Sequence, residues 1–350
     1  MSDKSFRGFA PGRVNLIGEH TDYNGGMVLP AALSVGLEVA LTPHDQPISH
    51  ITSMDHSEPA ERMIDEPANG HWSDTALGAL QEAKRLRLID DGADLSIAST
   101  IPAGSGLSSS AALMVAILKA ARAANGSGPD DVALALAAQR VENDYLGVPC
   151  GIMDQMAVAL ATPGTAMALD TNSLSYDLLE LPRDHALVVI HSGIVRKLTE
   201  GRYKERKLEC DEAKAHFGTN DLCLLDPAEI EAASLTGPAK LRALHCATEH
   251  RRVLAAAEAL RSGDIAQLGA LMNASHASMR DLFAMSLPPI DALVESAVEL
   301  GAVGARLTGG GFGGCIVACV GQDARENWQS ELIARHPQTR YIDAVSGTPA

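Results

Sequence analysis

The chain has 350 residues, of which 46% are hydrophobic and 21% charged, a profile typical of a folded globular protein and not of a disordered one. At about 150 residues per domain, this length predicts two domains or one large one. Lysine and arginine number 28 against 44 aspartates and glutamates, so the formal net charge is −16. Such an acidic chain is a poor candidate for binding nucleic acid or an anionic membrane through bulk electrostatics, although a local site could still hold an anionic substrate.

The first residues and the cysteines predict a cytoplasmic protein. The chain opens MSDKSFRGFAPGR, which lacks the apolar core of a signal peptide, and no stretch is long and apolar enough to predict a membrane-spanning helix. The six cysteines are scattered and form no CxxC pair, so we expect reduced, buried thiols. We expect neither nucleic acid nor membrane as a partner, and we expect a monomer.

The first half of the chain is predicted to be rich in strands. Val35–Leu41 and Leu95–Ile101 have the composition of strands, and the polar residues 53–71 between them are predicted to form a surface excursion. Asp130 is the expected N-cap of a helix that Gly147 and Pro149 end. The predicted helices of this half cover residues 75–86, 109–124, 130–146 and 152–160, and the strands that follow them cover 165–170, 178–181 and 186–190.

The second half is predicted to be rich in helices. These helices cover residues 199–217, 242–262, 264–285, 290–300 and 323–335, with strands at 315–320 and 340–345. A strand-rich half followed by a helix-rich half predicts an α+β protein with two lobes. We place the boundary near residue 185, which gives domains at 1–185 and 186–350.

The segment Ala10–Gly26, APGRVNLIGEHTDYNGG, is the first of three with a dense set of special residues. Glu19, His20 and Asp22 place hydrogen-bond acceptors and a switchable donor within four residues, and the glycines around them allow a bent backbone. A neutral polyol needs such a set, because each hydroxyl must meet a fixed donor or acceptor. Taken alone, the segment is equally well explained as a charged surface turn.

The second segment, PAGSGLSSSAA at residues 102–112, follows a predicted strand and opens a predicted helix. Gly104 and Gly106 let backbone amides face inward, and the helix N-terminus adds free N–H groups, which together favour a bound phosphate. It is not a Walker A loop, because Gly-Lys-Ser/Thr is missing, and Ser109 replaces the third glycine of a dinucleotide fingerprint. Its serines could donate to phosphate, and one could ligate Mg²⁺. The alternative is a serine-capped helix after a glycine turn.

The third segment, LTGGGFGGC at residues 307–315, has five glycines in six positions. Ordering so many glycines is costly unless the backbone must approach something closely, so we consider a second wall of a nucleotide site. A tight connection packed against another segment is the alternative.

Two carboxylates, Glu142 and Asp154, flank the predicted helix break. Near a phosphate, they could serve Mg²⁺ and a substrate hydroxyl. Asp154 could instead be an ordinary acidic residue of a helix N-terminus.

Together and in this order, the segments resemble the three motifs of the GHMP small-molecule kinases, and GRVNLIGEHTDYN resembles the signature of the galactokinases within that family. The resemblance continues in CGIMDQ (150–155), EGRYKER (200–206) and SHASMRD (275–281), so its anchors span residues 10–315. It implies a two-lobed fold, with an N-terminal lobe like domain 2 of ribosomal protein S5 and a helix-rich, ferredoxin-like C-terminal lobe. It also implies an active site in the cleft between the lobes.

The implied reaction is transfer of the ATP γ-phosphoryl group to the C1 hydroxyl of galactose, with Mg²⁺ as cofactor. By the resemblance, Asp154 would take the hydroxyl proton, and Arg13 would keep Asp154 ionised and stabilise the transition state. The sugar-binding residues would be Glu19, His20, Thr21, Asp22, Gly151 and Tyr203. The ATP-binding residues would be Gly104, Ser105, Gly106, Leu107, Ser108, Ser109 and Ser110, with Ser53 and Trp72 near the adenine, and Ser110 and Glu142 would be the Mg²⁺ ligands.

Two other functions stay open from the sequence. One is a different sugar-1-kinase of the family, acting on arabinose, N-acetylgalactosamine or galacturonate. The other is a non-catalytic sensor of ATP and galactose, against which the intact Ser109, Ser110, Glu142 and Asp154 argue. The stretch after Arg280, DLFAMSLPPID, is more apolar than is common in the family, and we expect it to pack near the lobe interface.

Overall fold

The structure is a computed structural model that describes residues 4–194 and 199–347. The chain forms two compact units, and neither is one continuous segment. Unit 1 comprises the described parts of Met1–Arg13, Leu33–Ala103 and Leu107–Leu160, and unit 2 those of Val14–Ala32, Gly104–Gly106 and Ala161–Ala350. Because the chain passes between the units several times, no single cut separates them. The domain boundary near residue 185 therefore stays a prediction.

Unit 1 is built on a sheet in which two strands, residues 48–53 and 93–99, alternate buried and exposed or partly exposed residues along their length. The strands are β1 (Phe6–Asn15), β3 (Pro30–Pro43), β4 (Ile48–Ser53), β5 (His56–Met63) and β6 (Ala93–Ser99). Strand β6 is antiparallel to β3 on one side and parallel to β4 on the other, and β5 is antiparallel to β4. Residues 53–71 were predicted to be a surface excursion, and part of this segment instead forms strand β5 of the β4–β5 hairpin. Only Ala60 and Arg62 of β5 are buried, so this strand has the polar composition of a surface loop.

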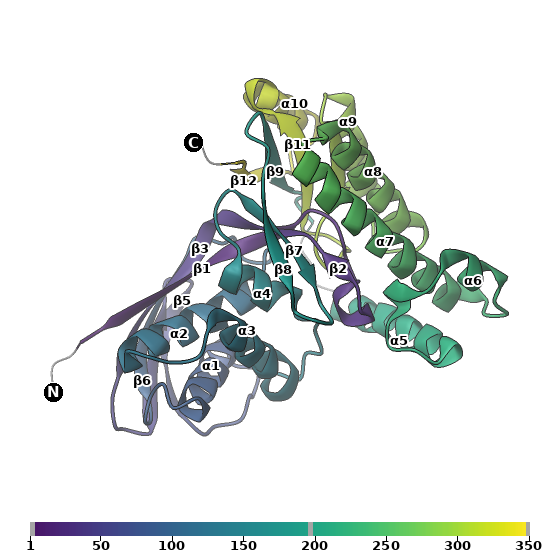
Figure 1. Cartoon of the computed structure of the whole chain (residues 1–350). Coiled ribbons are helices and arrows are strands. Elements are labelled where there is room, and N and C mark those ends of the chain that lie inside the picture. The colour runs from purple at the N-terminus through teal and green to yellow at the C-terminus, as the bar shows by residue number, and fades with distance from the viewer. Residues whose placement is uncertain (1–3, 195–198, 348–350) are drawn as a thin grey trace. The chain divides into compact units, whose positions relative to one another are not determined.

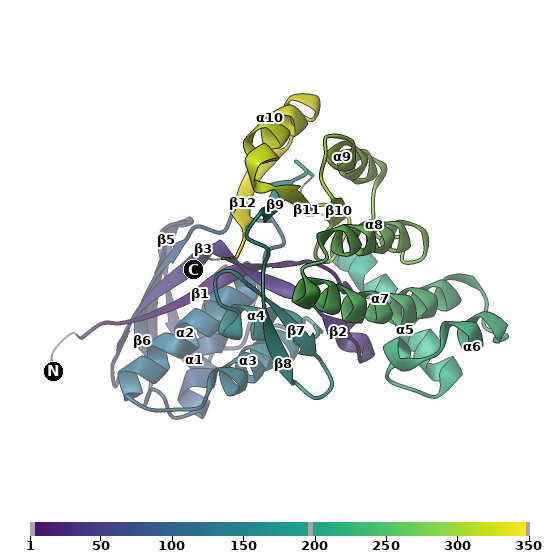
Figure 2. The ribbon, with the colours of Figure 1, turned by 45° about the horizontal axis from the view of Figure 1, so that its top comes forward.

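The helices of unit 1 cover one face of this sheet (Figures 1 and 2). They are α1 (Asp74–Arg85), α2 (Ser109–Asn125), α3 (Asp131–Arg140) and α4 (Met153–Leu160). Helix α2 packs directly on β1, where a Cβ added to Gly8 would lie 1.9 Å from the carbonyl oxygen of Ala116. Asp130 caps α3 as predicted, accepting a 2.8 Å hydrogen bond from the amide of Ala133. The predicted helix to residue 146 is α-helical only to Arg140 and continues as a π-helical turn over Val141–Tyr145.

Unit 2 contains a short strand set and a second sheet. In the first, β7 (Thr165–Asp170) pairs with β2 (Met27–Val28) and β8 (Tyr176–Glu180). The second sheet is antiparallel in the order β10-β11-β9-β12, formed by Gly304–Leu307, Cys315–Gly321, His185–His191 and Arg340–Val345. The strand pattern missed β10, which has only four residues. Cys315 and Cys319 of β11 are buried, as the apolar run predicts.

The helices of unit 2 are α5 (Thr199–Phe217), α6 (Pro227–Ala232), α7 (Gly237–Ser262), α8 (Ile265–Asp281), α9 (Pro288–Glu299) and α10 (Arg325–Arg335). Helices α7 and α8 run side by side (Figures 1 and 2). Helix α7 begins five residues before its predicted start, with Pro238 in its first turn, where a missing N–H costs nothing. The short α6 was not predicted. The α+β class is confirmed.

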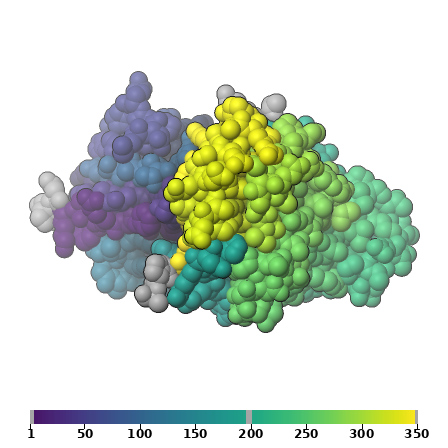
Figure 3. Space-filling view, turned by 90° about the horizontal axis from the view of Figure 1, so that it is seen from above, coloured from purple at the N-terminus to yellow at the C-terminus, as the bar shows by residue number. Residues whose placement is uncertain are grey.

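The C-terminal residues belong to the core and surface of unit 2. Trp328 of α10 is buried and donates a 2.9 Å hydrogen bond to the carbonyl of Ala297 on α9. In the space-filling view, the yellow C-terminal residues form one continuous surface with the green helical residues (Figure 3). Within the part of the chain that the structure describes, no helix combines the length and the apolar content needed to cross a bilayer.

Candidate functional site

A bidentate ion pair joins Arg13 of β1 to Asp154 in the first turn of α4. Arg13 Nε lies 2.8 Å from Asp154 Oδ1, and Nη2 lies 2.8 Å from Oδ2. The Arg13 side chain is 5% exposed and the Asp154 side chain 33% exposed. The guanidinium is thus buried and fixes a carboxylate whose other side is open to solvent. The bidentate contact fixes the orientation of the carboxylate, while the catalytic roles of both residues stay a prediction.

A second carboxylate, Glu142, lies in the π-helical turn near this pair. It accepts hydrogen bonds from Ser110, from Gln155 and, at 3.2 Å, from the thiol of Cys150. Burial and the neighbouring charge of Asp154 raise the pKa of Glu142, against these hydrogen bonds, which lower it. Unit 1 therefore brings Ser110, Glu142 and Asp154 together, and their oxygens are the hard donors that Mg²⁺ prefers.

The predicted phosphate loop has the backbone conformation that an anion cradle needs. Gly104 and Gly106 have φ of 69° and 75°, and Ser108 before α2 has φ of 63°. The Ser108 hydroxyl is buried, does not cap the helix and has no hydrogen-bond partner among the described residues. An orphaned buried hydroxyl at the start of a long helix fits a ligand with acceptor oxygens. The segment divides between the units, with Gly104–Gly106 in unit 2 and residues 107–110 in unit 1.

The two residues predicted near adenine are both neighbours of His56 in unit 1. Ser53 pairs with His56 across the β4–β5 hairpin. The ring of Trp72 stacks on that of His56, with centroids 4.3 Å apart and planes 13° from parallel. The fold of unit 1 therefore brings Ser53 and Trp72 to the same residue, and their contact with adenine stays a prediction.

In unit 2, His20 is the centre of an aromatic cluster. Its ring stacks on Phe283 at 4.4 Å, lies 5.3 Å from the ring of Tyr203, and its Nδ1 lies 2.6 Å from the hydroxyl of Tyr23. His20 has φ of 61°, an uncommon conformation outside glycine that this packing maintains. Phe283 belongs to the apolar stretch after Arg280, so that stretch packs beneath the predicted sugar-binding residues.

The other predicted sugar-binding residues differ in accessibility. Thr21 is fully buried, and its hydroxyl lies 2.8 Å from the carbonyl oxygens of both Gly18 and Met27, so it shapes the turn. Asp22 and Tyr203 are partly buried, and Gly151 is buried in unit 1. The structure thus places Glu19, His20, Thr21, Asp22 and Tyr203 in unit 2, and Gly151 in unit 1 with Asp154.

The carboxylate of Glu19 is held by protein groups. It pairs with the guanidinium of Arg306, accepts a 2.9 Å hydrogen bond from the amide of Gly309 and lies 3.3 Å from the hydroxyl of Thr308. Burial raises the pKa of Glu19, and Arg306 opposes that rise. With Glu19 2% exposed, this network ties the first motif to the third. A direct contact between Glu19 and sugar stays a prediction.

A second buried acid, Glu249 of α7, extends the same network. It accepts hydrogen bonds from the Gly18 amide at 3.0 Å, the Ser275 hydroxyl at 2.5 Å and Arg252 Nε at 2.7 Å, and its carboxylate lies 3.9 Å from Arg306 Nη2. Although burial raises the pKa of Glu249, Arg252, His245, Arg306 and Ser275 lower it to about 2. Helices α7 and α8 therefore hold the turn of the first motif.

Arg306 and Glu249 were missed at the sequence level. Arg306 stands alone among small and apolar residues just before the glycine-rich loop, and an arginine in a buried strand needs a buried acid as partner. The isolated arginine in an apolar run could therefore have indicated a buried ion pair. Glu249 lies in the charged run TEHRR, where it has the pattern of a solvated helix face, and no local feature distinguishes it.

A buried histidine of this region predicts a pH dependence of stability. His245 is fully buried between the Ser278 hydroxyl at 2.8 Å and the Glu19 carbonyl at 3.2 Å, and burial lowers its pKa from 6.5 to about 4. The unfolded chain binds this proton below pH 6.5 and the folded chain does not, so stability falls as the pH drops from 6.5 toward 4. The difference contributes about 3 kcal/mol across that window.

Urea denaturation at several pH values measures this effect. We expect His245→Gln to weaken the dependence between pH 6.5 and 4, and His216→Ala, at an exposed position, to leave it unchanged. An unaltered slope in His245→Gln would show that folding does not lower the pKa of His245.

Three family models match the chain. The model of the galactokinase galactose-binding signature covers residues 2–43, that of the GHMP kinases N-terminal domain covers 68–162, and that of the GHMP kinases C-terminal domain covers 256–338. The first contains Arg13 and the Glu19–Asp22 segment, and the second contains the phosphate loop, Glu142 and Asp154.

The chain is also similar to curated and solved galactokinases. It is 41% identical to a galactokinase of Roseiflexus sp., an alignment covering 97% of this chain and 88% of that protein. It is 40% identical to a galactokinase of Haemophilus influenzae, covering 95% and 89%. The crystal structure of Lactococcus lactis galactokinase complexed with galactose superposes with a TM-score of 0.92 at 31% identity, covering 99% of this chain and 95% of that one.

A more distant structure shares only the fold. Mevalonate kinase of Methanococcus jannaschii superposes with a TM-score of 0.74 at 18% identity, covering 99% of this chain and 100% of that one. The galactokinase matches are closer and extend over almost the whole chain, as does the motif order. The chain belongs to the galactokinase family of GHMP kinases, which are ATP-dependent small-molecule kinases.

Proposed function

We propose that the protein transfers the γ-phosphoryl group of ATP to the C1 hydroxyl of galactose, giving galactose 1-phosphate and ADP. The observation that carries the proposal is the bidentate Arg13–Asp154 pair beside Glu142 and Ser110. It supplies a fixed carboxylate next to a set of hard oxygen donors, in a chain with the galactose-binding signature. Phosphoryl transfer needs alignment and charge neutralisation more than covalent chemistry, and this arrangement suits both needs.

In the proposed reaction, Asp154 accepts the proton of the C1 hydroxyl as its oxygen attacks the γ-phosphorus. The bond from that oxygen to phosphorus forms while the bond to the β–γ bridging oxygen breaks, and ADP leaves with that electron pair. Arg13 orients Asp154 before the transfer and stabilises negative charge during it. If Asp154 only orients the hydroxyl, the same pair still fixes the direction of attack.

We propose that the phosphates are held by residues 104–110 and that Ser110 and Glu142 ligate Mg²⁺. The donor set fits this ion, because a hydroxyl and a carboxylate already lie within hydrogen-bond distance of each other and a second carboxylate lies nearby. When bound, the ion neutralises charge on the transferring phosphates. Asp22, His20, Glu19 and Tyr203 would bind the sugar hydroxyls, and Ser53 and Trp72 would lie near the adenine.

Replacement of Ser110 tests the metal assignment. Ser110→Ala removes one oxygen ligand, so we expect the Mg²⁺ concentration for half-maximal activity to rise about tenfold. Ser127→Ala, at an exposed position beyond α2, is the matched control and should leave it unchanged. An unchanged metal requirement in Ser110→Ala would move the ligand to another residue.

The function itself is tested by ADP release from Mg²⁺–ATP with galactose, 2-deoxygalactose, galactosamine, N-acetylgalactosamine, arabinose, galacturonate and glucose, with Asp154→Asn as the blank. We expect turnover on galactose, alone or together with its 2-deoxy analogue. Turnover only on arabinose or galacturonate would support the proposed phosphoryl-transfer mechanism and would mean that the contacts proposed at the C6 end of the sugar are wrong. Galactose binding with no turnover on any sugar would identify a sensor.

We further propose that the protein acts as a monomer in the cytoplasm.

A further inference from the structure

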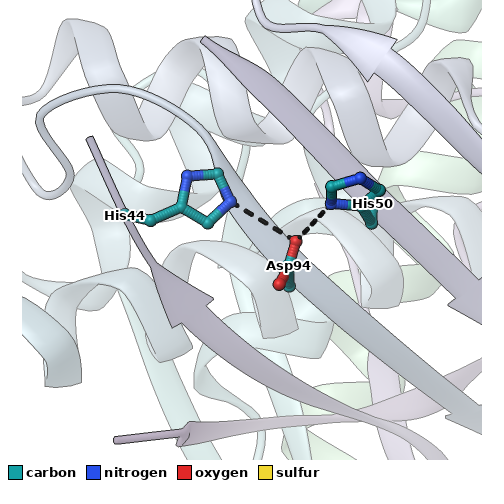
Figure 4. Close-up of side chains that lie close together, drawn as sticks. All are labelled: His44, His50 and Asp94. Carbon is teal, nitrogen blue, oxygen red and sulfur yellow. Dashed lines mark hydrogen bonds and ion pairs between the residues drawn. The ribbon is translucent and has the colours of Figure 1, made fainter. Parts of the chain in front are cut away.

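Three metal-ligating side chains of unit 1 converge on its sheet, and none has a role in the reaction above (Figure 4). His44 follows β3, Asp94 lies on β6 and His50 lies on β4. His44 Nε2 lies 3.3 Å from Asp94 Oδ1, and His50 Nδ1 lies 2.8 Å from the same oxygen. One potential ligand atom of each residue lies within 4.8 Å of the other two.

The two separations to Asp94 are close to those of ligand atoms around one ion. With metal–ligand distances of about 2.0–2.1 Å, the ligands of a tetrahedral site lie about 3.3 Å from one another. The two separations to Asp94 are 3.3 and 2.8 Å, so small rotations of side chains would admit an ion. The side chains of His50 and Asp94 are about half exposed, at 53% and 52%, so an ion can reach them from solvent.

The backbone that carries the three residues is hydrogen-bonded and rigid. Strand β6, with Asp94, lies between β3 and β4, and Thr42 faces Asp94 across the antiparallel pair. The amide of His44 donates a 3.1 Å hydrogen bond to the carbonyl of Gly92, which fixes the turn after β3 against the start of β6. Two of the ligands therefore lie on neighbouring strands and the third directly follows the strand beside them, so little ordering is needed on binding.

A fourth residue orients one of the ligands. Glu61 of β5 faces His50 across the β4–β5 hairpin, and its Oε2 lies 3.6 Å from His50 Nε2. With an ion bound, a carboxylate on that side would favour the tautomer with the proton on Nε2, which leaves the Nδ1 lone pair for the ion in place of its present hydrogen bond with Asp94. Histidine ligands of metals are commonly oriented in this way by an acidic group on the second nitrogen.

We propose that His44, His50 and Asp94 bind a divalent transition-metal ion of the zinc class, with water completing the coordination and Glu61 as an orienting residue. Two imidazoles and one carboxylate are the ligand types that suit such ions, whereas Mg²⁺ prefers oxygen ligands alone. The ion would connect β3, β6 and β4 on the exposed face of the sheet. It is distinct from the Mg²⁺ proposed for Ser110 and Glu142.

Isothermal titration of the full chain with ZnCl₂ tests the proposal. Excess Mg²⁺ in the buffer competes for oxygen-rich sites, so that the titration reports the histidine site. We expect one saturable site, at least a tenfold loss of affinity in His44→Ala and in His50→Ala, and about a tenfold loss in Glu61→Gln. His216→Ala and Glu58→Gln, both at exposed positions, are the matched controls and should bind as the unchanged protein does.

Co²⁺ provides a second measurement that does not depend on catalysis. Bound through two imidazoles and a carboxylate, it should give a visible absorption band that disappears in His44→Ala and His50→Ala. Because both histidines are at the surface of the sheet, circular dichroism should show that the variants remain folded. Equal zinc affinity in the histidine variants, or no saturable binding in the unchanged protein, would overturn the proposal.

Discussion

Replacing Asp154 by asparagine should lower kcat by roughly 10²–10⁴-fold while leaving ATP affinity near its original value. The reason is chemical, because asparagine keeps the shape and one acceptor for Arg13 but cannot take a proton from a hydroxyl. Arg13 loses one charge-assisted hydrogen bond of the bidentate pair, so the free energy of unfolding should also fall by about 1–3 kcal/mol. ADP release, nucleotide titration and urea denaturation measure the three quantities separately.

The matched control is Asp144→Asn, an exposed acid of the π-helical turn beside Glu142. It changes the net charge by the same amount, so a general electrostatic effect would appear in both variants. A large loss of kcat in Asp154→Asn alone supports a role in proton transfer. Near-normal turnover of Asp154→Asn would remove the residue from the base role and leave it the orienting one.

The second large effect is expected on stability, in Arg306→Met. Arg306 is fully buried and lies against two buried acids, Glu19 and Glu249. Methionine fills similar volume but leaves Glu19 without its counter-charge, and breaking a buried pair in this way typically costs about 3–5 kcal/mol. Urea denaturation at neutral pH measures the loss. Arg335→Met, which removes an exposed pair with Glu299, should change stability by less than about 1 kcal/mol.

A double-mutant cycle separates the buried charge from the loss of packing. Glu19→Gln in the Arg306→Met background removes the uncompensated carboxylate, so the double variant should be less destabilised than the sum of the single variants, by about 0.5–3 kcal/mol. Strict additivity would mean that Arg306 stabilises through its hydrogen bond to the Asn15 carbonyl and its packing, and not through Glu19.

The sequence alone was sufficient for most regular elements. Helix 199–217 and strands 165–170 and 340–345 match their observed bounds, because each is a periodic segment delimited by residues that favour turns. Strands at the edges of the sheets were harder to predict from the sequence. Strand β5 is solvated over most of its length, so its composition is that of a loop, and only pairing with β4 makes it a strand. Strand β10 is too short for periodicity to be visible.

The functional residues also divide into features that the sequence predicts and features that only the tertiary structure shows. The order of three glycine-rich or acidic motifs was sufficient to determine the family, because such motifs are local in sequence and retain their residue types at fixed spacing. The pairing of Arg13 with Asp154 was expected from the resemblance, but its bidentate geometry and burial depend on β1 and α4 meeting across 141 residues. Only tertiary structure decides contacts of that range.

What the tertiary structure alone decided is where the charges are buried. Glu19 was predicted as a sugar ligand, and the fold places it against Arg306, a residue 287 positions away that carried no assigned role. Likewise, His44, His50 and Asp94 are unremarkable in the sequence and meet only because β6 inserts between β3 and β4. Sequence patterns record local periodicity and residue type, whereas burial and pairing of charges depend on which distant segments the core brings together.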